Sequence, residues 1–173
     1  MPDDPLDPSF GADLGAVSIE ELRRRRAVAD ERETACSYLR RMVQARLDIV
    51  GAERARRAAG EPAGDVSDLV DRLPGILGEH VHAPGRGRLS QLMAPGETDP
   101  VLQQRLDAIL ANADLAALPA LDEGELGRLQ AELESFEQEV SGVRRQLHTL
   151  LDSMSSEVVR RYRDGEARPD DLL

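Results

Sequence analysis

Lysine and tryptophan are absent from this chain of 173 residues, and aromatic residues make up only 2% of it. A compact core built on large rings is therefore not expected, and all 22 basic residues are arginine. Alanine, leucine, arginine and glutamate dominate instead, and these residues favour helices. The composition predicts long helices that pack along narrow apolar seams.

The sequence also has only one cysteine, Cys36, and no apolar run of membrane-spanning length. A single cysteine excludes an intramolecular disulfide, and a 20-residue apolar segment would be needed to span a bilayer. The N-terminus is acidic and does not resemble a signal peptide. These features predict a cytoplasmic protein that does not enter a membrane.

The net charge is −11, from 22 basic and 33 acidic residues. Direct DNA binding is not expected, because contacts to phosphates need clustered cations. An acidic surface suits a basic partner instead, such as a DNA-binding protein.

Proline, glycine and capping residues divide the chain into five segments. Residues 1–17 are rich in Pro and Asp, which predicts a disordered acidic tail. Ser18 and Glu21 form a capping box, so a long helix is predicted over 18–60. The proline-rich connector 61–121 should hold short helices at about 66–73, 88–93 and 100–112. A second long helix is predicted over 122–165, followed by a flexible tail, 166–173.

The two long segments are internal repeats that align without a gap at an offset of 104 residues. Both polar and apolar positions match. The repeated polar residues follow the pattern E-x3-S-x2-R-x3-(Q or H)-x3-D. The first copy is Glu33, Ser37, Arg40, Gln44 and Asp48, and the second is Glu137, Ser141, Arg144, His148 and Asp152.

At 100° per residue, each copy forms a polar strip about 80° wide beside an apolar stripe. The first stripe is Leu22, Ala29, Cys36, Val43, Leu47 and Val50, and the second is Leu126, Leu133, Val140, Leu147, Leu151 and Met154. Pairing of the two stripes predicts an all-α fold, a long antiparallel two-helix coiled-coil hairpin with both polar strips on one side. We expect Glu33 to lie level with Asp152, and the two motif arginines to meet near the middle.

Facing arginines repel each other unless an anion lies between them, and the planar guanidinium fork is well shaped for phosphate. A carboxylate can accept hydrogen bonds from both N1–H and N2–H of guanine. The layout therefore predicts a two-fold nucleotide ligand, with phosphates bound at the centre and guanines at the ends.

The motif spacing resembles that of the RsiG-type anti-sigma factors of actinobacteria, over about residues 18–165. The resemblance implies that all ten motif residues bind cyclic di-GMP, as an intercalated dimer, on the outside of the hairpin. It also implies that the loaded protein sequesters WhiG, a flagellar-type sigma factor that controls sporulation. His148 departs from the pattern, where Gln is expected. Histidine also donates and accepts hydrogen bonds, so we expect the contact to persist.

Other readings of the sequence are weaker. A structural coiled-coil adaptor or chaperone without a nucleotide ligand is the main alternative, since a repeated polar strip can serve salt bridges alone. No positioned base or metal set indicates an enzyme. Glu79, His80 and His82 lack further ligands at a zinc spacing, so no metal is predicted. Cys36 lies in the apolar stripe and is interpreted as core.

Overall fold

The computed structural model describes residues 4–61, 66–78, 100–111 and 115–167. These residues are helical or form turns, with no strand among them. Two long helices, α1 (Ile19–Ala58) and α4 (Glu123–Arg163), carry the two motif copies. Between them in the sequence come α2 (Val66–Gly78), α3 (Pro100–Ala111) and the short 3-10 helix η1 (Leu115–Ala120).

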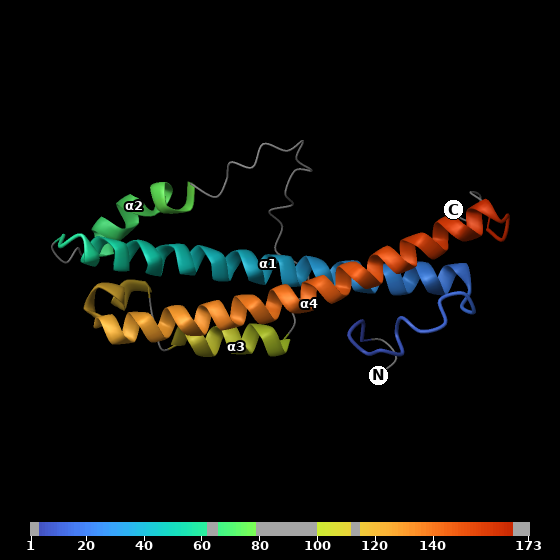
Figure 1. Ribbon diagram of the computed structural model, residues 1–173, viewed down its shortest axis with the longest axis horizontal. Coiled ribbons are helices and arrows are strands. Elements are labelled where there is room, and N and C mark those ends of the chain that lie inside the picture. Colours follow the sequence, from blue (N-terminus) through green and yellow to red (C-terminus); the bar gives the residue numbers. More distant parts are fainter. Residues whose placement is uncertain (1–3, 62–65, 79–99, 112–114, 168–173) are drawn as a thin grey trace. The chain divides into compact units, whose positions relative to one another are not determined.

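The chain divides into two compact units, and both long helices contribute to each. The terminal unit contains the described residues up to Ser37 and from Ser141 onwards, and the central unit contains those from Tyr38 to Val140. Within each unit, a stretch of α1 packs antiparallel against a stretch of α4 (Figure 1). The all-α helical hairpin predicted from the sequence is confirmed.

Capping residues set where the long helices begin. Ser18 Oγ accepts a hydrogen bond of 3.1 Å from the Glu21 backbone N–H. At the equivalent position, Asp122 Oδ1 accepts from Glu125 N–H, and the Glu125 carboxylate accepts from Asp122 N–H, both at 2.7 Å. These contacts satisfy backbone donors that have no partner within the helix.

Glycines in the left-handed region end both long helices. Gly60 has φ of 74° and Gly165 has φ of 73°. The next residue in each case, Glu61 or Glu166, donates its N–H back to the carbonyl of Arg56 or Arg161. This is the Schellman arrangement, which favours glycine because it has no Cβ.

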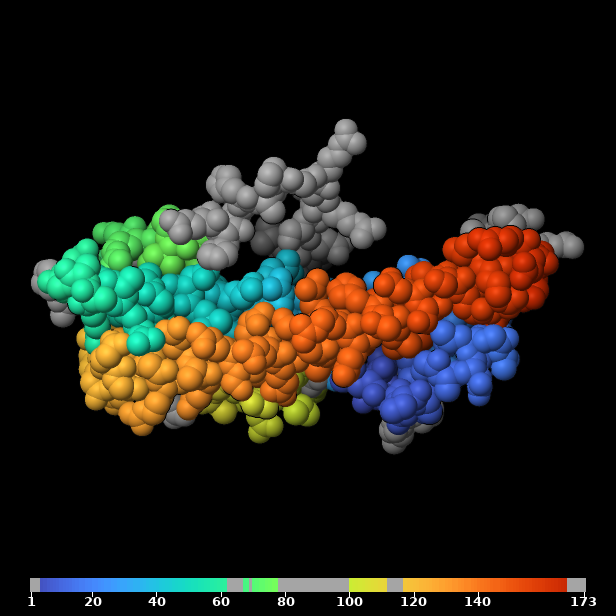
Figure 2. Space-filling model, viewed as in Figure 1, coloured from blue at the N-terminus to red at the C-terminus, as the bar shows by residue number. Residues whose placement is uncertain are grey.

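The predicted apolar stripes form the seams between the long helices. Leu22, Ala29, Cys36, Val43 and Val50 are fully buried, as are Leu126, Val140, Leu147 and Met154. Leu47 and Leu151, which are equivalent in the repeat, are only half-buried. In the central unit α3 adds Leu102, Leu106 and Ile109 to the core, and it lies beside the first half of α4 (Figure 2).

The N-terminal segment differs from the disorder predicted for residues 1–17. Residues 5–16 form consecutive turns, and Phe10 is only 1% exposed. Phe10 joins the core of the terminal unit with Ile19, Leu22, Ala29, Met154 and Ala167. Arg25 stacks over its ring at 5.7 Å and donates a hydrogen bond to its carbonyl. One buried ring therefore orders a segment whose composition is otherwise typical of disorder.

The connector also departs from prediction at Pro74. The helix expected over 66–73 continues through Pro74 to Gly78. A proline inside a helix removes only one backbone N–H donor. It bends the helix without always ending it. The helix expected over 88–93 lies outside the described residues. None of the described helices has the length and apolarity that crossing a bilayer requires.

A candidate nucleotide site on the paired helices

The ten motif residues lie on α1 and α4 and are distributed over both units. Most are half-buried beside the seam, whereas His148 and Asp152 are exposed. The terminal unit holds Glu33, Ser37, Ser141, Arg144, His148 and Asp152, and the central unit holds Arg40, Gln44, Asp48 and Glu137.

In the terminal unit, Glu33 is the centre of a small polar cluster. Its Oε1 accepts hydrogen bonds from Arg144 Nε at 2.8 Å and from Ser37 Oγ at 2.7 Å. His148 Nε2 lies 3.2 Å from the same oxygen. Two hydrogen-bond donors and the His148 ring therefore gather at one carboxylate oxygen of α1.

These contacts keep Glu33 ionised. Burial raises the pKa of its carboxyl group, but the hydrogen bonds from Arg144 and Ser37 and the charges of His148 and Arg144 outweigh burial. The pKa of Glu33 is therefore below its ordinary value.

In the central unit, Arg40 faces Glu137, and Arg40 Nη1 lies 3.8 Å from Glu137 Oε1. Arg40 and Glu137 are the repeat equivalents of Arg144 and Glu33. Both units therefore contain the same cross-copy pair, in which the glutamate of one copy faces the arginine of the other. Arg40 Nε is buried and has no hydrogen-bond acceptor among the described residues.

The observed pairing corrects the register expected from the sequence. Glu33 was predicted to lie level with Asp152, but its contacts on α4 are Arg144 and His148, one to two turns earlier. Without a bound anion, the arginines gain more from opposite charges than from facing each other. The structure thus pairs acid with base where the sequence predicted pairs of acids.

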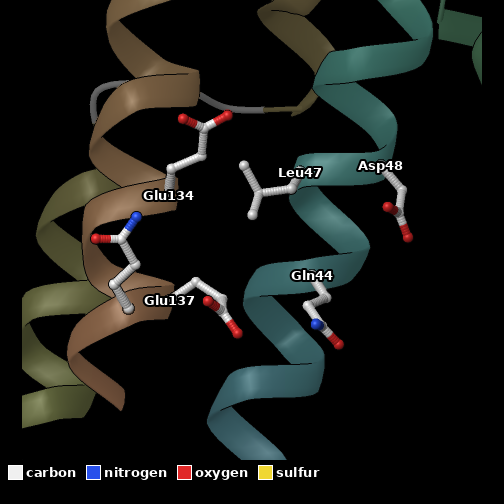
Figure 3. A pocket seen from close by; sticks show the side chains of 6 residues that line it. Gln44, Leu47, Asp48, Glu134 and Glu137 are labelled. Atoms are coloured by element: carbon white, nitrogen blue, oxygen red, sulfur yellow. The ribbon is translucent and has the colours of Figure 1, made fainter. Parts of the chain in front are cut away.

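A hollow of about 320 Å³ lies beside this pair in the central unit. Three motif residues, Gln44, Asp48 and Glu137, line it together with Leu47, Glu134 and Gln138. Figure 3 shows Leu47 of α1 and Glu134 of α4 pointing toward one another, with Glu137 reaching from α4 toward α1. The hollow offers carboxylates and amides beside an apolar surface, a combination that suits a nucleobase.

Sequence reasoning missed Glu134 and Gln138 as lining residues. Glu134 lies one helical turn before Glu137, so the two share a face of α4. The equivalents of Glu134 and Gln138 in the first copy are Asp30 and Thr34, so neither position is identical in the two copies. The strict repeat pattern therefore gave no signal, and helical spacing from Glu137 would have found Glu134.

Metal binding has no support from these residues. No group of three or more His, Cys, Asp or Glu side chains gathers at one point within the part of the chain that the structure describes. Glu79, His80 and His82 lie outside that part.

A model of the RsiG-like family matches residues 8–77 and 112–173. The chain belongs to the RsiG-like family. The second matched stretch begins 104 residues after the first, which is the offset of the internal repeat. A search of curated proteins gave no match.

Family membership supports a role as an anti-sigma factor, with a sigma factor as the general class of partner. The RsiG-like family is a regulatory family and not a family of enzymes.

Proposed function

We propose that this RsiG-like protein is an anti-sigma factor that binds two molecules of cyclic di-GMP on its paired helices. When loaded, it sequesters a flagellar-type sigma factor of the WhiG kind and represses the genes that this factor controls, including those of sporulation. The observation that carries the proposal is the repeated cross-copy pair, Glu33 with Arg144 and Arg40 with Glu137.

Phosphate can replace the glutamates as partner of the two arginines. The side chains of Arg40 and Arg144 are 28% and 34% exposed, so a ligand can reach them without unfolding the seam. Phosphate oxygens accept two parallel hydrogen bonds from an arginine, as a carboxylate does. Each unit therefore offers one arginine that can bind a phosphate of the nucleotide.

The glutamates can then bind the bases. A carboxylate that is released from arginine can accept from N1–H and N2–H of guanine. The hollow beside Glu137 provides space for a base, and the half-buried Leu47 provides an apolar surface for its face. This division of roles, phosphates to arginines and guanines to carboxylates, favours cyclic di-GMP over a nucleotide with other bases.

Binding of the nucleotide and binding of the sigma factor are coupled under one condition. The hairpin conformation that captures the sigma factor must also bind cyclic di-GMP more tightly than the free protein does. The nucleotide-free protein keeps its arginines and glutamates paired with each other. Loading exchanges those internal ion pairs for ligand contacts and leaves a changed surface for the partner.

The second candidate function is an adaptor without a small ligand, in which the polar strips only join α1 to α4. The hydrogen bond between Glu33 and Arg144 favours it, because the motif residues already satisfy one another.

Measuring capture of a WhiG-type sigma factor by the immobilised protein, with and without cyclic di-GMP, separates the two. We expect nucleotide to strengthen capture by roughly tenfold or more, the usual scale of coupling between two sites. Equal capture in both conditions contradicts the nucleotide switch and supports the adaptor.

A further inference from the structure

Both long helices end in a second repeated element, E-x2-R-R, which lies outside the nucleotide motif. It comprises Glu53, Arg56 and Arg57 on α1, and Glu157, Arg160 and Arg161 on α4. In each copy the two arginines donate hydrogen bonds to one carboxylate. The distances are 2.6 to 2.8 Å around Glu53 and 2.8 to 2.9 Å around Glu157.

The second arginine of each element reaches across to a different segment. Arg161 Nη2 donates to the carbonyl of Leu14 at 2.7 Å, just before α1 begins. Arg57 Nη2 donates to the carbonyl of Leu118 at 3.0 Å, just before α4 begins. Leu14 and Leu118 are themselves 104 residues apart, so the contact occurs at equivalent positions in both units.

Arg57 makes two further hydrogen bonds to the backbone just before α4. It donates to the carbonyl of Leu121 at 2.6 Å and to that of Pro119 at 3.2 Å. These carbonyls belong to η1 and to Leu121, directly before α4 begins. Each arginine therefore ties the end of one long helix to the beginning of the other.

Three charged side chains of these elements are buried, so their hydrogen bonds are shielded from water. Glu53, Arg56 and Arg161 are each only 6% exposed. A buried donor that loses its acceptor is unfavourable, because water cannot replace the lost hydrogen bond. Sliding α1 along α4 would take the Leu14 carbonyl away from the buried Arg161. It would also break the bond from Arg57, whose side chain is 23% exposed, to the Leu118 carbonyl.

The apolar seam alone does not prevent such sliding. It consists of Leu, Val, Ala, Cys and Met side chains at heptad-like spacing, and such side chains pack acceptably in more than one register. Buried polar groups are what fix register in coiled coils. The register in turn decides whether Glu33 meets Arg144 and whether Arg40 meets Glu137.

We propose that Arg57 and Arg161 are positioning residues of the nucleotide site, one in each unit. They donate hydrogen bonds to residues outside the motif, and they act by fixing the register in which the motif residues meet. The role in ligand binding rests on the proposed function, whereas the role in register does not depend on it.

The test uses the full chain with Arg161→Gln, and Arg163→Gln as its matched control. Arg163 is exposed and lies two residues further along the same helix. If Arg161→Gln does not fold, Arg161→Lys replaces it. Lysine retains the charge near Glu157 but lacks the planar fork that spans Glu157 and the Leu14 carbonyl.

The register of α1 against α4 is measured without nucleotide. Glu33→Cys and Arg144→Cys are introduced together and cross-linked with a short bis-maleimide. Cys36 is fully buried and should remain unmodified. We expect rapid cross-linking in the parent and in the Arg163→Gln protein, and several-fold slower cross-linking in Arg161→Gln at unchanged helicity. An equal rate in all three proteins overturns the proposal.

Binding of cyclic di-GMP to the same variants, without the introduced cysteines, measures the consequence for the ligand. We expect roughly tenfold weaker binding for Arg161→Gln, because a site that is no longer preorganised must be ordered on binding. Slower cross-linking with unchanged nucleotide affinity would overturn the claim that the register set by Arg161 determines nucleotide binding. If neither the parent nor the control binds nucleotide, the proposed function fails, and cross-linking still decides the register.

Discussion

Glu33 accepts a hydrogen bond of 2.8 Å from Arg144 Nε, so the carboxylate of one motif copy holds the guanidinium of the other. The repeat equivalents Glu137 and Arg40 face each other in the same way. In the nucleotide-free protein each motif arginine is therefore already paired with a motif glutamate. A ligand must offer better partners to both groups at once, which a guanine dinucleotide does.

Acid should destabilise the protein between about pH 4.5 and pH 2. Hydrogen bonds from Arg56 and Arg57 lower the pKa of Glu53 to about 2, and those from Arg160 and Arg161 do the same for Glu157. The ordinary value is 4.5, so the unfolded chain takes up these protons first as the pH falls. The stabilisation is complete above the ordinary pKa and is lost as the pH falls through the folded one.

Urea unfolding at several pH values measures this loss, with Glu53→Gln as the informative variant. Glu53→Gln should be less stable than wild type at neutral pH and should lose less stability on acidification. A wild-type unfolding free energy that stays constant from about pH 5 to pH 2 would contradict the account.

Phe10→Ala should lower the free energy of unfolding by about 3 kcal/mol, the usual effect of removing a buried aromatic ring. Phe10 is 1% exposed and lies in the core of the terminal unit. Pro8→Ala, at an exposed position in the same segment, is the control and should change stability little. Chemical denaturation measures both. If the two variants are equally stable, the N-terminal segment does not belong to the folded core.

The helix termini and the seam were predictable because their signals are local. Ser18 with Glu21 and Asp122 with Glu125 are capping pairs, and heptad-like spacing marks the buried stripes. The order of the N-terminal segment was not predictable, since it depends on one phenylalanine within a Pro- and Asp-rich stretch. The continuation of α2 through Pro74 was missed because a proline inside a helix is tolerated in some contexts.

The motif residues were predictable as a set, but their pairing was not. The repeat placed five of them on one strip of each helix, yet the register between the helices depends on non-local contacts. The bond from Arg161 to the Leu14 carbonyl joins residues 147 positions apart, and no helical pattern indicates it. Sequence therefore predicted which residues lie along the two helices but not which of them pair across the seam.

His148→Gln should retain cyclic di-GMP binding within a few-fold of wild type, because it restores the residue found at Gln44 in the first copy. His148→Ala should bind more weakly, since it removes a side chain that is proposed to make a hydrogen bond to the nucleotide. Calorimetric titration of the two variants tests the equivalence. Loss of binding in His148→Gln would show that the second copy needs histidine itself.

Calorimetric titration of cyclic di-GMP into three proteins tests the central claim most directly. These are the wild type, the Arg40→Ala/Arg144→Ala variant and the Arg41→Ala/Arg145→Ala variant. The second variant removes the same charge from the neighbouring exposed arginines of each repeat.

We predict that two nucleotides bind to the wild type and to the Arg41/Arg145 variant with similar affinity. The Arg40/Arg144 variant should bind roughly a hundredfold more weakly, because it loses two charge-assisted contacts to phosphate. Absence of heat with the wild type, or equal binding by the Arg40/Arg144 variant, would contradict the account.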